Sequence, residues 1–513
     1  MTDYCQKISA ARVYDAAIRS PLDCAVKLSA RLDNTVWLKR EDLQPVFSFK
    51  LRGAYNKIAQ LNKQQLGNGV ICSSAGNHAQ GVALAAKELG IRAVMVMPKT
   101  TADIKVDAVR RLGGEVILHG DSYDDAYAHA NKLSSSEGLF FVHPFDDPDV
   151  IAGQGTVGAE VLEQLQGIGA TADAIFVPVG GGGLIAGIAS WVKHYSPDTA
   201  IIGVEPEDSA GMKASLEAGE PVTLSQVGIF ADGVAVKRIG DETFRICNEL
   251  VDEIITVDTD ETCAAIKDIF EDTRTIVEPA GALAVAGAKK YATQVTGKNL
   301  VAINSGANIN FYRLRHVAER AAIGEQQEAL LAVEIPERQG AFKNFCSAIG
   351  RRNVTEFNYR LGNGEGHSSC ANIFVGLETT GEPGEIESLI AELEGHGYRV
   401  INMSDNEAAK VHVRHMVGGL APGLQDEKLL RFVFPERPGA LMDFLEEIGA
   451  RWNISLFHYR NHGADYGRVL AGIQVPAGDT KDLTGHLQAL AYPWWDESDN
   501  PAYRVFLNGD WPD

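Results

Sequence analysis

Short apolar runs alternate with helical patterns from Lys50 to about residue 320. Apolar runs bounded by turn residues are typical of strands that are buried on both faces. The expected strands are 35–40, 70–72, 93–97, 115–118, 174–179, 201–204 and 300–303. Alanine-rich amphipathic stretches, such as 81–89 and 280–291, predict helices between them. This order is typical of an α/β fold whose mostly parallel strands are covered by helices.

The pattern changes near residue 325, where a polar stretch precedes two segments that repeat each other. Residues 335–341 match 434–440, and residues 353–360 match 453–460. Each copy predicts a strand, a glycine-containing turn, an amphipathic helix and a second strand. We therefore expect an α/β region at 1–325 and two α+β modules, at 326–420 and 421–513.

The net charge of −21 at pH 7 argues against a nucleic-acid partner and against an anionic membrane surface. No apolar run reaches the roughly 18 residues that cross a bilayer, and residues 1–12 have no signal-peptide pattern. The seven cysteines have neither paired nor zinc-ligand spacing and suit a reducing compartment. We therefore expect a cytoplasmic protein without a bound metal.

Lys50 follows an expected extended run, 46–49, and precedes a helical pattern, 51–61. An amine that is held against apolar neighbours such as Phe49 has its charged form disfavoured, so its pKa falls and it can react as a nucleophile. Such a lysine can form a Schiff base with an aldehyde cofactor. Taken alone, a solvated lysine near a helix start is the commoner explanation of this pattern.

A loop rich in small and polar residues, 73–81, follows the strand 70–72 and leads into a helix. Ligands of parallel sheets bind beyond the carboxyl ends of the strands. The unpaired N–H groups of a helix N-terminus also attract anions. With the hydroxyl of Ser74 and the amide of Asn77, this loop suits a carboxylate. An ordinary helix cap built from serine and asparagine is the alternative.

Four consecutive glycines, 180–183, follow the next expected strand and precede a helix. Their free backbone N–H groups predict a phosphate cradle. A dinucleotide fold is the rival interpretation, because Gly181, Gly183 and Ala186 fit G-x-G-x-x-A. In that interpretation Glu205, which ends the following strand, would bind a ribose.

Ser305 follows the strand 300–303 at the same expected edge, although a Ser-Gly pair alone is a common turn. An amine, an anion-binding loop, a phosphate cradle and a hydroxyl are together what a pyridoxal phosphate enzyme needs to act on an amino acid. A nicotinamide site would leave Lys50 and the loop 73–81 unused. A non-catalytic amino-acid sensor with the same fold is a third possibility.

The chain resembles the biosynthetic threonine dehydratases, in the tryptophan-synthase-β-like group of pyridoxal phosphate enzymes. The resemblance is carried by SFKLRGA at 48–54, SAGNHAQG at 74–81, PFDDPDVIAGQGT at 144–156, PVGGGGL at 178–184, ADGVAVKRIGDETF at 231–244 and SGANINF at 305–311. It implies a fold-type II catalytic domain of two mostly parallel-sheet subdomains. For the duplicated segment it implies a tandem ACT-like regulatory domain, and for the whole protein a homotetramer.

The resemblance also implies a role for each expected site residue. Lys50 would hold the cofactor as a Schiff base and remove the α-proton, and Ser305 would face the pyridine nitrogen. Asn77 would bond the ring hydroxyl oxygen. The phosphate would bind Gly180, Gly181, Gly182, Gly183 and Leu184, and the substrate carboxylate would bind Ser74, Ala75, Gly76, Asn77 and His78. The implied reaction is the conversion of L-threonine to 2-oxobutanoate and ammonia in isoleucine biosynthesis, with L-serine as a secondary substrate.

Ala75 separates this chain from the serine racemases of the same group, in which a serine at this position works on the opposite face of the substrate. Because alanine cannot exchange a proton, the sequence favours elimination over racemisation. The resemblance further implies inhibition by isoleucine and antagonism by valine. The candidate effector-binding positions are Gly340, Ala341, Tyr359, Gly439, Ala440 and Tyr459. A position in the strand core is the alternative for the two tyrosines.

Overall fold

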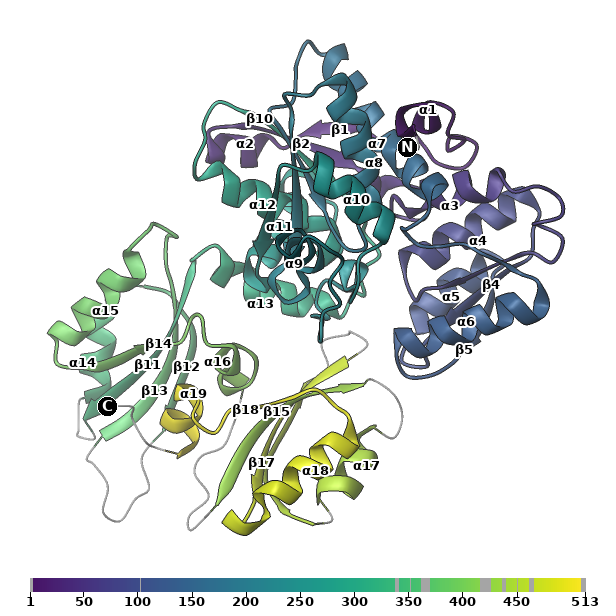
Figure 1. Cartoon of the computed structure of the whole chain (residues 1–513). Helices are drawn as coiled ribbons and strands as arrows, with labels where there is room; N and C mark the ends of the chain where they lie inside the picture. The colour runs from purple at the N-terminus through teal and green to yellow at the C-terminus, as the bar shows by residue number, and fades with distance from the viewer. Residues whose placement is uncertain are drawn as a thin grey trace. The chain divides into compact units, whose positions relative to one another are not determined.

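The computed structural model describes residues 3–101, 103–336, 341–350, 352–360, 370–415, 426–435, 440–449, 451–460 and 466–508. The chain divides into two compact units, Met1–Ala321 and Ala322–Asp513. The first unit contains two mostly parallel sheets and the second contains two antiparallel sheets (Figure 1), as the predicted fold class requires. The domain boundary at 325 stays a prediction, and the boundary at 420 lies outside the described residues.

The larger sheet of the first unit has the strand order β1-β2-β10-β7-β8-β9, in which only β1 is antiparallel to its neighbour. Its strands are β1 Leu22–Cys24, β2 Thr35–Arg40, β7 Ala174–Pro178, β8 Ala200–Pro206, β9 Glu253–Val257 and β10 Asn299–Asn304. The side chains of β7 are buried throughout, as expected for a central parallel strand with helices on both faces. The strands predicted at 35–40, 174–179, 201–204 and 300–303 are therefore confirmed.

Two apolar cores cover the two faces of this sheet. On one face the helices are α2 Val26–Leu32, α11 Thr259–Thr273 and α12 Pro279–Ala292. On the other face they are α1 Tyr4–Ser9, α7 Pro148–Gly167, α8 Gly183–Tyr195, α9 Gly211–Ala218 and α10 Asp241–Leu250. Helices α7 and α8 pack almost backbone to backbone, because a Cβ on Gly187 would lie 2.6 Å from the Gly155 nitrogen.

The smaller sheet has four parallel strands in the order β5-β4-β3-β6. Its elements are α3 Lys50–Ala59, β3 Val70–Ser73, α4 Asn77–Leu89, β4 Ala93–Met97, α5 Asp103–Arg111, β5 Glu115–Leu118, α6 Tyr123–Glu137 and β6 Phe140–Phe141. Helices α3, α4 and α5 cover one face, and α6 covers the other. The prediction that 115–118 is a buried strand is wrong: β5 is an edge strand with both ends exposed.

Two further sequence predictions differ from the structure. The extended run expected at 46–49 is wrong, because Phe47 has a left-handed backbone with a φ of 56° and Phe49 is already helical. Helix α4 begins at Asn77 rather than at Gly81, since the small residues of the loop allow a helical first turn. The chain therefore reaches Lys50 through a turn, and Asn77 and His78 lie in the first turn of a helix.

The second unit contains the duplicated module. Its first sheet has the order β12-β13-β11-β14 and its second the order β16-β17-β15-β18, and each is antiparallel. The first copy comprises β11 Glu328–Pro336, α14 Ala341–Ala348, β12 Val354–Arg360, β13 Cys370–Glu378, α15 Glu385–Gly395, β14 Arg399–Asn402 and α16 Glu407–Val411. The second comprises β15 Glu427–Pro435, α17 Ala440–Phe444, β16 Asn453–Arg460, β17 Tyr466–Gln474, α18 Thr480–Leu490, β18 Trp494–Asp496 and α19 Pro501–Tyr503.

The duplication extends to small details of the two copies. The register shift between Val354 and Glu356 recurs between Ile454 and Leu456. Both Asn406 and Asn500 cap a short helix, and the Asn406 amide donates to the Asn500 side-chain oxygen at 3.1 Å. The predicted order of strand, helix and strand is present in each copy. The helix α13, Arg313–Gly324, precedes the first copy.

Candidate active site

Lys50 is the first residue of helix α3 and is half-buried. Its Nζ donates to the Pro144 carbonyl at 2.9 Å and lies 5.3 Å from the centroid of the Phe49 ring. Burial lowers the pKa of Lys50 to about 8, and the negative charge of Glu278 opposes part of that shift. A substantial fraction of this amine is therefore neutral just above neutral pH, as a nucleophile or a general base requires.

The glycine run lies between β7 and α8, and its close contacts leave no space for side chains. A Cβ on Gly181 would lie 2.2 Å from the Phe145 ring, and a Cβ on Gly180 would lie 2.9 Å from the Val234 Cα. Gly182 has a φ of 92°, a conformation that favours glycine. Because α8 begins at Gly183, the N–H groups of its first turn have no acceptor within the helix and can bind an anion.

The loop after β3 presents small groups to open space. The Ser74 Oγ accepts from the Gly76 N–H at 3.2 Å, and a Cβ on Gly76 would have no heavy atom within 4 Å. Ala75 lies between these two residues and is only partly buried. Since α4 starts at Asn77, the loop ends at a second helix N-terminus.

The side chain of His78 is buried, and its Nε2 lies 2.9 Å from the Val142 carbonyl oxygen. Burial, with a smaller contribution from the charge of Lys50, lowers the pKa of His78 to about 3. The imidazole is therefore neutral at physiological pH. Any contribution of His78 to a substrate carboxylate would come from its backbone N–H.

Ser305 comes directly after β10 and is buried, with its Oγ 3.3 Å from the Ala280 carbonyl oxygen. Its own carbonyl accepts from the Phe49 N–H at 3.2 Å, which places it next to the residue before Lys50. The hydroxyl of Ser305 thus lies at the carboxyl end of β10, beside the start of α3.

Asn77 belongs to a hydrogen-bonded group that the sequence alone did not reveal. Its Nδ2 donates to the Glu278 Oε1 at 2.5 Å, and its Oδ1 accepts from the Asn308 Nδ2 at 2.7 Å. Asn308 also donates to the Val46 carbonyl at 2.8 Å. Glu278 is the acid directly before Pro279 in an otherwise apolar, alanine-rich stretch, and that isolated charge was the available signal.

Glu278 lies in a space that two glycines leave open. A Cβ on Gly306 would lie 2.4 Å from the Glu278 Oε1, and a Cβ on Gly233 would lie 3.6 Å from it. Burial, together with the nearby charge of Asp232, raises the pKa of Glu278 to about 7. Asp232 itself is engaged elsewhere, by Lys105 at 2.7 Å and by Arg313 at 3.1 Å.

Backbone contacts bring these elements together around the strand ends. Pro144, the acceptor for Lys50, precedes Phe145, which packs on the glycine run. Val234 packs on Gly180, and its neighbour Gly233 lies beside Asn77. The site thus combines a reactive amine, two helix N-termini, an amide and a hydroxyl. This donor set fits pyridoxal phosphate, because the amine suits its aldehyde and the glycine cradle suits its phosphate.

The dinucleotide interpretation is wrong, and Glu205 illustrates why. Its carboxylate accepts from the backbone N–H groups of Met212 and Lys213, at 2.8 and 2.9 Å. Burial raises the pKa of Glu205 to about 7. This acid is thus occupied at the start of α9 and is not presented to a ribose.

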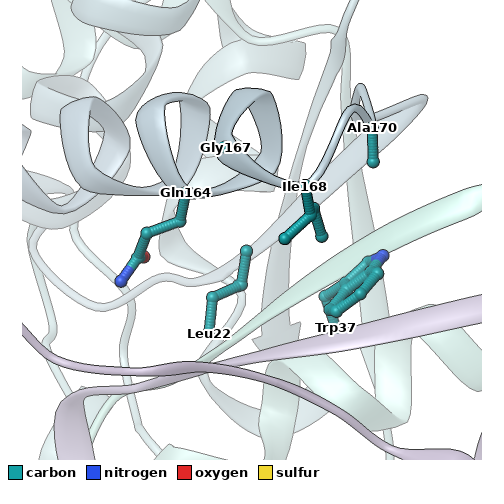
Figure 2. A pocket seen from close by; sticks show the side chains of 6 residues that line it. All are labelled: Leu22, Trp37, Gln164, Gly167, Ile168 and Ala170. Atoms are coloured by element: carbon teal, nitrogen blue, oxygen red, sulfur yellow. The ribbon is translucent and has the colours of Figure 1, made fainter.

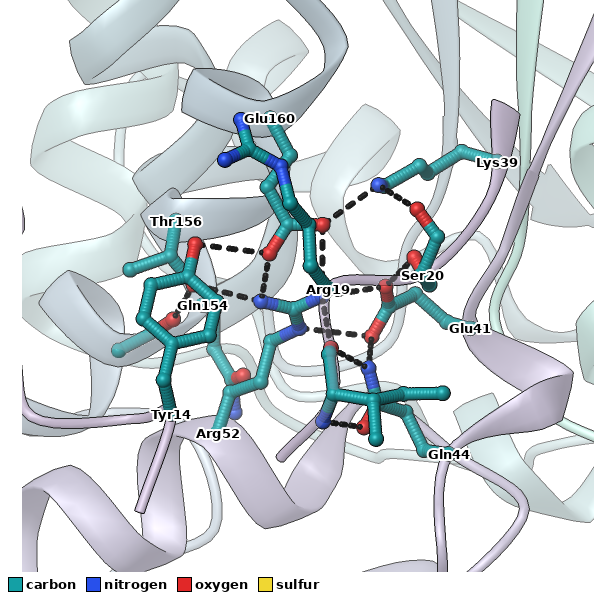
Figure 3. A network of polar contacts seen from close by, with 12 residues as sticks. Tyr14, Arg19, Ser20, Lys39, Glu41, Gln44, Arg52, Gln154, Thr156 and Glu160 are labelled. Atoms are coloured by element: carbon teal, nitrogen blue, oxygen red, sulfur yellow. Dashed lines mark hydrogen bonds and ion pairs between the residues drawn. The ribbon is translucent and has the colours of Figure 1, made fainter. Parts of the chain in front are cut away.

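The start of α3 is held by a cluster of buried charges, which we call the Arg52 cluster: Lys39, Glu41, Arg52 and Glu160 (Figure 3). The Arg52 guanidinium binds both Glu41 oxygens at 2.8 Å and the two Glu160 oxygens at 2.6 and 3.1 Å. The Lys39 Nζ donates to Glu160 at 2.6 Å. Because Arg52 lies two residues after Lys50, this cluster fixes the helix that carries the amine.

An open cavity of about 640 Å³ is lined by Leu22, Trp37, Gln164, Gly167, Ile168 and Ala170 (Figure 2), and the Gln164 side chain accepts from Lys39 of the Arg52 cluster at 2.9 Å. Ala170 precedes β7, whereas the glycine run follows it. The cavity therefore borders the end at which β7 begins, opposite to the end that carries the site. Among the described residues, no helix is both long enough and apolar enough to cross a membrane.

The candidate effector positions are only partly described. Gly340 and Gly439 lie outside the described residues. Ala341 opens helix α14 and Ala440 opens helix α17, where Ala440 is buried. Tyr359 lies in β12 and Tyr459 lies in β16, at corresponding places in the two copies. Their assignment to an effector site stays a prediction.

Comparison with known proteins connects both units to one enzyme class. Residues 13–306 match the family of pyridoxal-phosphate dependent enzymes, and residues 319–413 and 418–507 match the C-terminal regulatory domain of threonine dehydratase. The L-threonine dehydratase biosynthetic IlvA of Burkholderia multivorans is 57% identical over 511 residues, which are 99% of each chain. That of Escherichia coli is 54% identical over 510 residues, 99% of this chain and 97% of the relative.

Solved structures resemble the first unit in the same way. The processed form of threonine deaminase isoform 2 from Solanum lycopersicum has a TM-score of 0.60 and 52% identity, and the match covers 62% of this chain and 92% of that one. Maize serine racemase has a TM-score of 0.58 and 33% identity, with 62% and 96% covered. Both likenesses cover about the length of the first unit.

Proposed function

Because the chain belongs to the biosynthetic threonine dehydratases, which are pyridoxal-phosphate-dependent lyases, we propose that it converts L-threonine to 2-oxobutanoate and ammonia with Lys50 as its base. The observation that carries this assignment is the Lys50 amine. Its pKa is lowered to about 8, and it is held at Pro144, beside the glycine run that Phe145 contacts. A neutral amine next to an anion cradle suits covalent binding of a phosphorylated aldehyde.

When bound, pyridoxal phosphate supplies an electron sink for the electron pair that is released when Cα loses its proton. Lys50 holds the cofactor first and, once free, takes that proton on Nζ. The N–H groups of the first turn of α8, with the glycines 180–183, would hold the phosphate. The loop from Ser74 to His78 would orient the substrate carboxylate, and Asn77 would donate to the ring hydroxyl oxygen.

Ser305 and Ala75 favour elimination over other fates of the amino acid. The neutral hydroxyl of Ser305 would face the ring nitrogen and would not hold a proton there as a carboxylate would, which would favour prompt loss of the β-hydroxyl. Ala75 has no group that could return a proton to the opposite face of Cα. The substrate loses water across Cα and Cβ, and the released enamine hydrolyses to 2-oxobutanoate and ammonia. L-Serine carries the same leaving group and is a secondary substrate.

Replacement of Lys50 by alanine tests this assignment. Removing a general base costs roughly 10²–10⁴-fold in rate, so Lys50→Ala should lower 2-oxobutanoate formation from threonine by at least that factor. It should also abolish the yellow colour that borohydride bleaches in the wild-type protein. Lys63→Ala, which changes an exposed lysine, is the matched control and should keep both properties. Near-normal turnover by Lys50→Ala would refute the role of this lysine.

The second unit is proposed to make this activity responsive to isoleucine, as inhibitor, and to valine, as its antagonist. The support is the match of its two copies to the threonine dehydratase regulatory domain and the place of threonine deamination in isoleucine biosynthesis. A coupling of about 1–3 kcal/mol between effector and substrate sites would change affinity about 5- to 150-fold. Candidate contacts are the turn and strand positions Gly340, Ala341, Tyr359, Gly439, Ala440 and Tyr459.

Effector titrations of the full chain test the regulatory proposal. Isoleucine should raise the threonine concentration needed for half-maximal rate, and valine added with isoleucine should lower it again. A chain that lacks residues 326–513 should keep threonine turnover but lose the response to both amino acids. Continued inhibition of that shortened chain would place the effector site in the first unit.

We further propose a cytoplasmic homotetramer with no nucleic-acid partner. The scattered cysteines suit a reducing compartment, and the net charge of −21 opposes binding to nucleic acid. The tetramer is supported by the family resemblance, and light scattering of the purified protein would measure its mass in solution.

A further inference from the structure

Glu278 is a buried carboxylate that contacts Asn77, one of the groups proposed to bind the cofactor. It is the residue before helix α12, and its backbone N–H donates to the Gly306 carbonyl at 3.1 Å. This bond fixes the main chain beside Ser305. The side chain reaches Asn77, on the opposite subdomain, at 2.5 Å. Glu278 therefore joins the end of the larger sheet to the first turn of α4.

The hydrogen bonds around Asn77 fix which way its amide points. Asn308 donates to its Oδ1, and Asn308 cannot rotate without losing its bond to the Val46 carbonyl. One N–H of the Asn77 Nδ2 is directed to Glu278. A flipped amide would place two acceptors, or two donors, face to face. The second N–H of Nδ2 is consequently left to donate to a ligand.

Different charged groups surround Glu278 and Lys50. Asp232 faces Glu278 from the turn at 232–234. The cations Lys105 of α5 and Arg313 of α13 also face Glu278, but each of them pairs directly with Asp232.

Lys50 is faced by His78 and His143, whose pKa values are both lowered, first of all by burial. Both imidazoles are therefore neutral when Lys50 titrates.

Glu278 is then the negative charge that acts on Lys50. Burial alone would drive the amine towards its neutral form, and the carboxylate counteracts this. We propose that Glu278 is a positioning residue of the active site, which aims the Asn77 amide at the cofactor and controls the protonation of Lys50 through its charge. The inference rests on the proposed function, since it assigns Asn77 and Lys50 to the same cofactor.

Two substitutions separate the two parts of this role. Glu278→Gln keeps an oxygen that accepts from Asn77 but removes the charge. Glu278→Ala removes both. Glu205→Gln is the matched control, because Glu205 is also a buried acid with a similarly raised pKa but with backbone partners at the start of α9.

The main readout is the pH titration of the visible absorption of the cofactor-loaded protein, which does not depend on turnover. Loss of a negative charge disfavours a nearby cation, so Glu278→Gln should move the midpoint down by roughly one pH unit. Its affinity for pyridoxal phosphate should stay within about threefold of wild type. Glu278→Ala should weaken that affinity by roughly tenfold, the loss expected for one hydrogen bond. Glu205→Gln should change neither property.

An unchanged midpoint in Glu278→Gln, or full cofactor affinity in Glu278→Ala, would overturn the inference. If Glu278→Ala does not fold, the near-isosteric Glu278→Gln still tests the effect of the charge. Failure of the proposed function would look different: the wild-type protein itself would bind no pyridoxal phosphate or release no 2-oxobutanoate. A wild-type protein that does both, with an unshifted Glu278→Gln, would refute the role of Glu278 alone.

Discussion

Two clusters of buried charge lie near the start of helix α3, and they shift the pKa values of their carboxylates in opposite directions. In the Arg52 cluster, Glu41 and Glu160 each meet a cation directly (Figure 3). Burial by itself would raise the pKa of Glu160, but the charges of Arg52 and Lys39 hold it below its ordinary value. In the other cluster, Glu278 meets a neutral amide, and burial raises its pKa to about 7.

This difference in pKa depends on which carboxylate the nearby cations contact. Lys105 and Arg313 both bind Asp232, so Glu278 receives only their longer-range influence. In the Arg52 cluster the cations instead contact the carboxylates directly, and the cluster serves to fix the helix. The carboxylate of Glu278 stays close to its titration point, where a small change in its surroundings alters its charge. The two clusters contain similar residues and differ in the pairing that the fold imposes.

The largest effect should come from breaking the Arg52 cluster. Arg52→Met leaves Glu41 and Glu160 buried without their shared cation, and loss of one partner from a buried ion pair costs about 3–5 kcal/mol. We expect the free energy of unfolding of the cofactor-free protein, measured in urea, to fall by that amount. Arg238→Met is the matched control, because the Arg238–Asp241 pair is exposed; the expected loss is below about 1 kcal/mol. Equal losses of unfolding free energy in the two variants would contradict the structural role assigned to the Arg52 cluster.

A smaller effect should appear in the pH dependence of stability. The pKa of Glu278 rises on folding from 4.5 to about 7, so between these pH values the folded protein keeps a proton that the unfolded chain has lost. The contribution of Glu278 to stability therefore falls as pH rises from about 5 to about 7, by up to roughly 1.4 kcal/mol per pH unit. Glu278→Gln should remove this contribution from the pH profile when unfolding is measured in urea at several pH values.

The same measurement on Glu160→Gln sharpens the contrast between the clusters. Because the pKa of Glu160 is lowered on folding, its stabilising contribution is present above its ordinary pKa and is lost as pH falls through the folded value. Its replacement should alter the acid side of the profile and leave the slope between pH 5 and pH 7 as in wild type. Identical profiles for the Glu160 and Glu278 variants would contradict the comparison.

Much of the fold could be predicted from local patterns. The apolar runs that became β7 and β10 are buried central strands, and the repeat at a spacing of about 100 residues corresponds to two copies of one antiparallel module. The predictions failed where pairing decides the outcome. Residues 115–118 are apolar enough for a core strand but form an edge strand. The turn before Lys50 depends on the left-handed backbone of Phe47, for which the sequence has no glycine signal.

The sequence by itself determined the reactive groups of this protein: a lysine at a helix start, glycines after a strand, a serine after another strand and a regulatory repeat. These are local features, because each depends on a residue type and on the element next to it. The tertiary structure alone decided how the buried charges are paired. Glu278 and Asn77 are 201 residues apart, and only the packing of two sheets brings them together. A pKa is set by such long-range neighbours and by burial, so it could not be read from either segment alone.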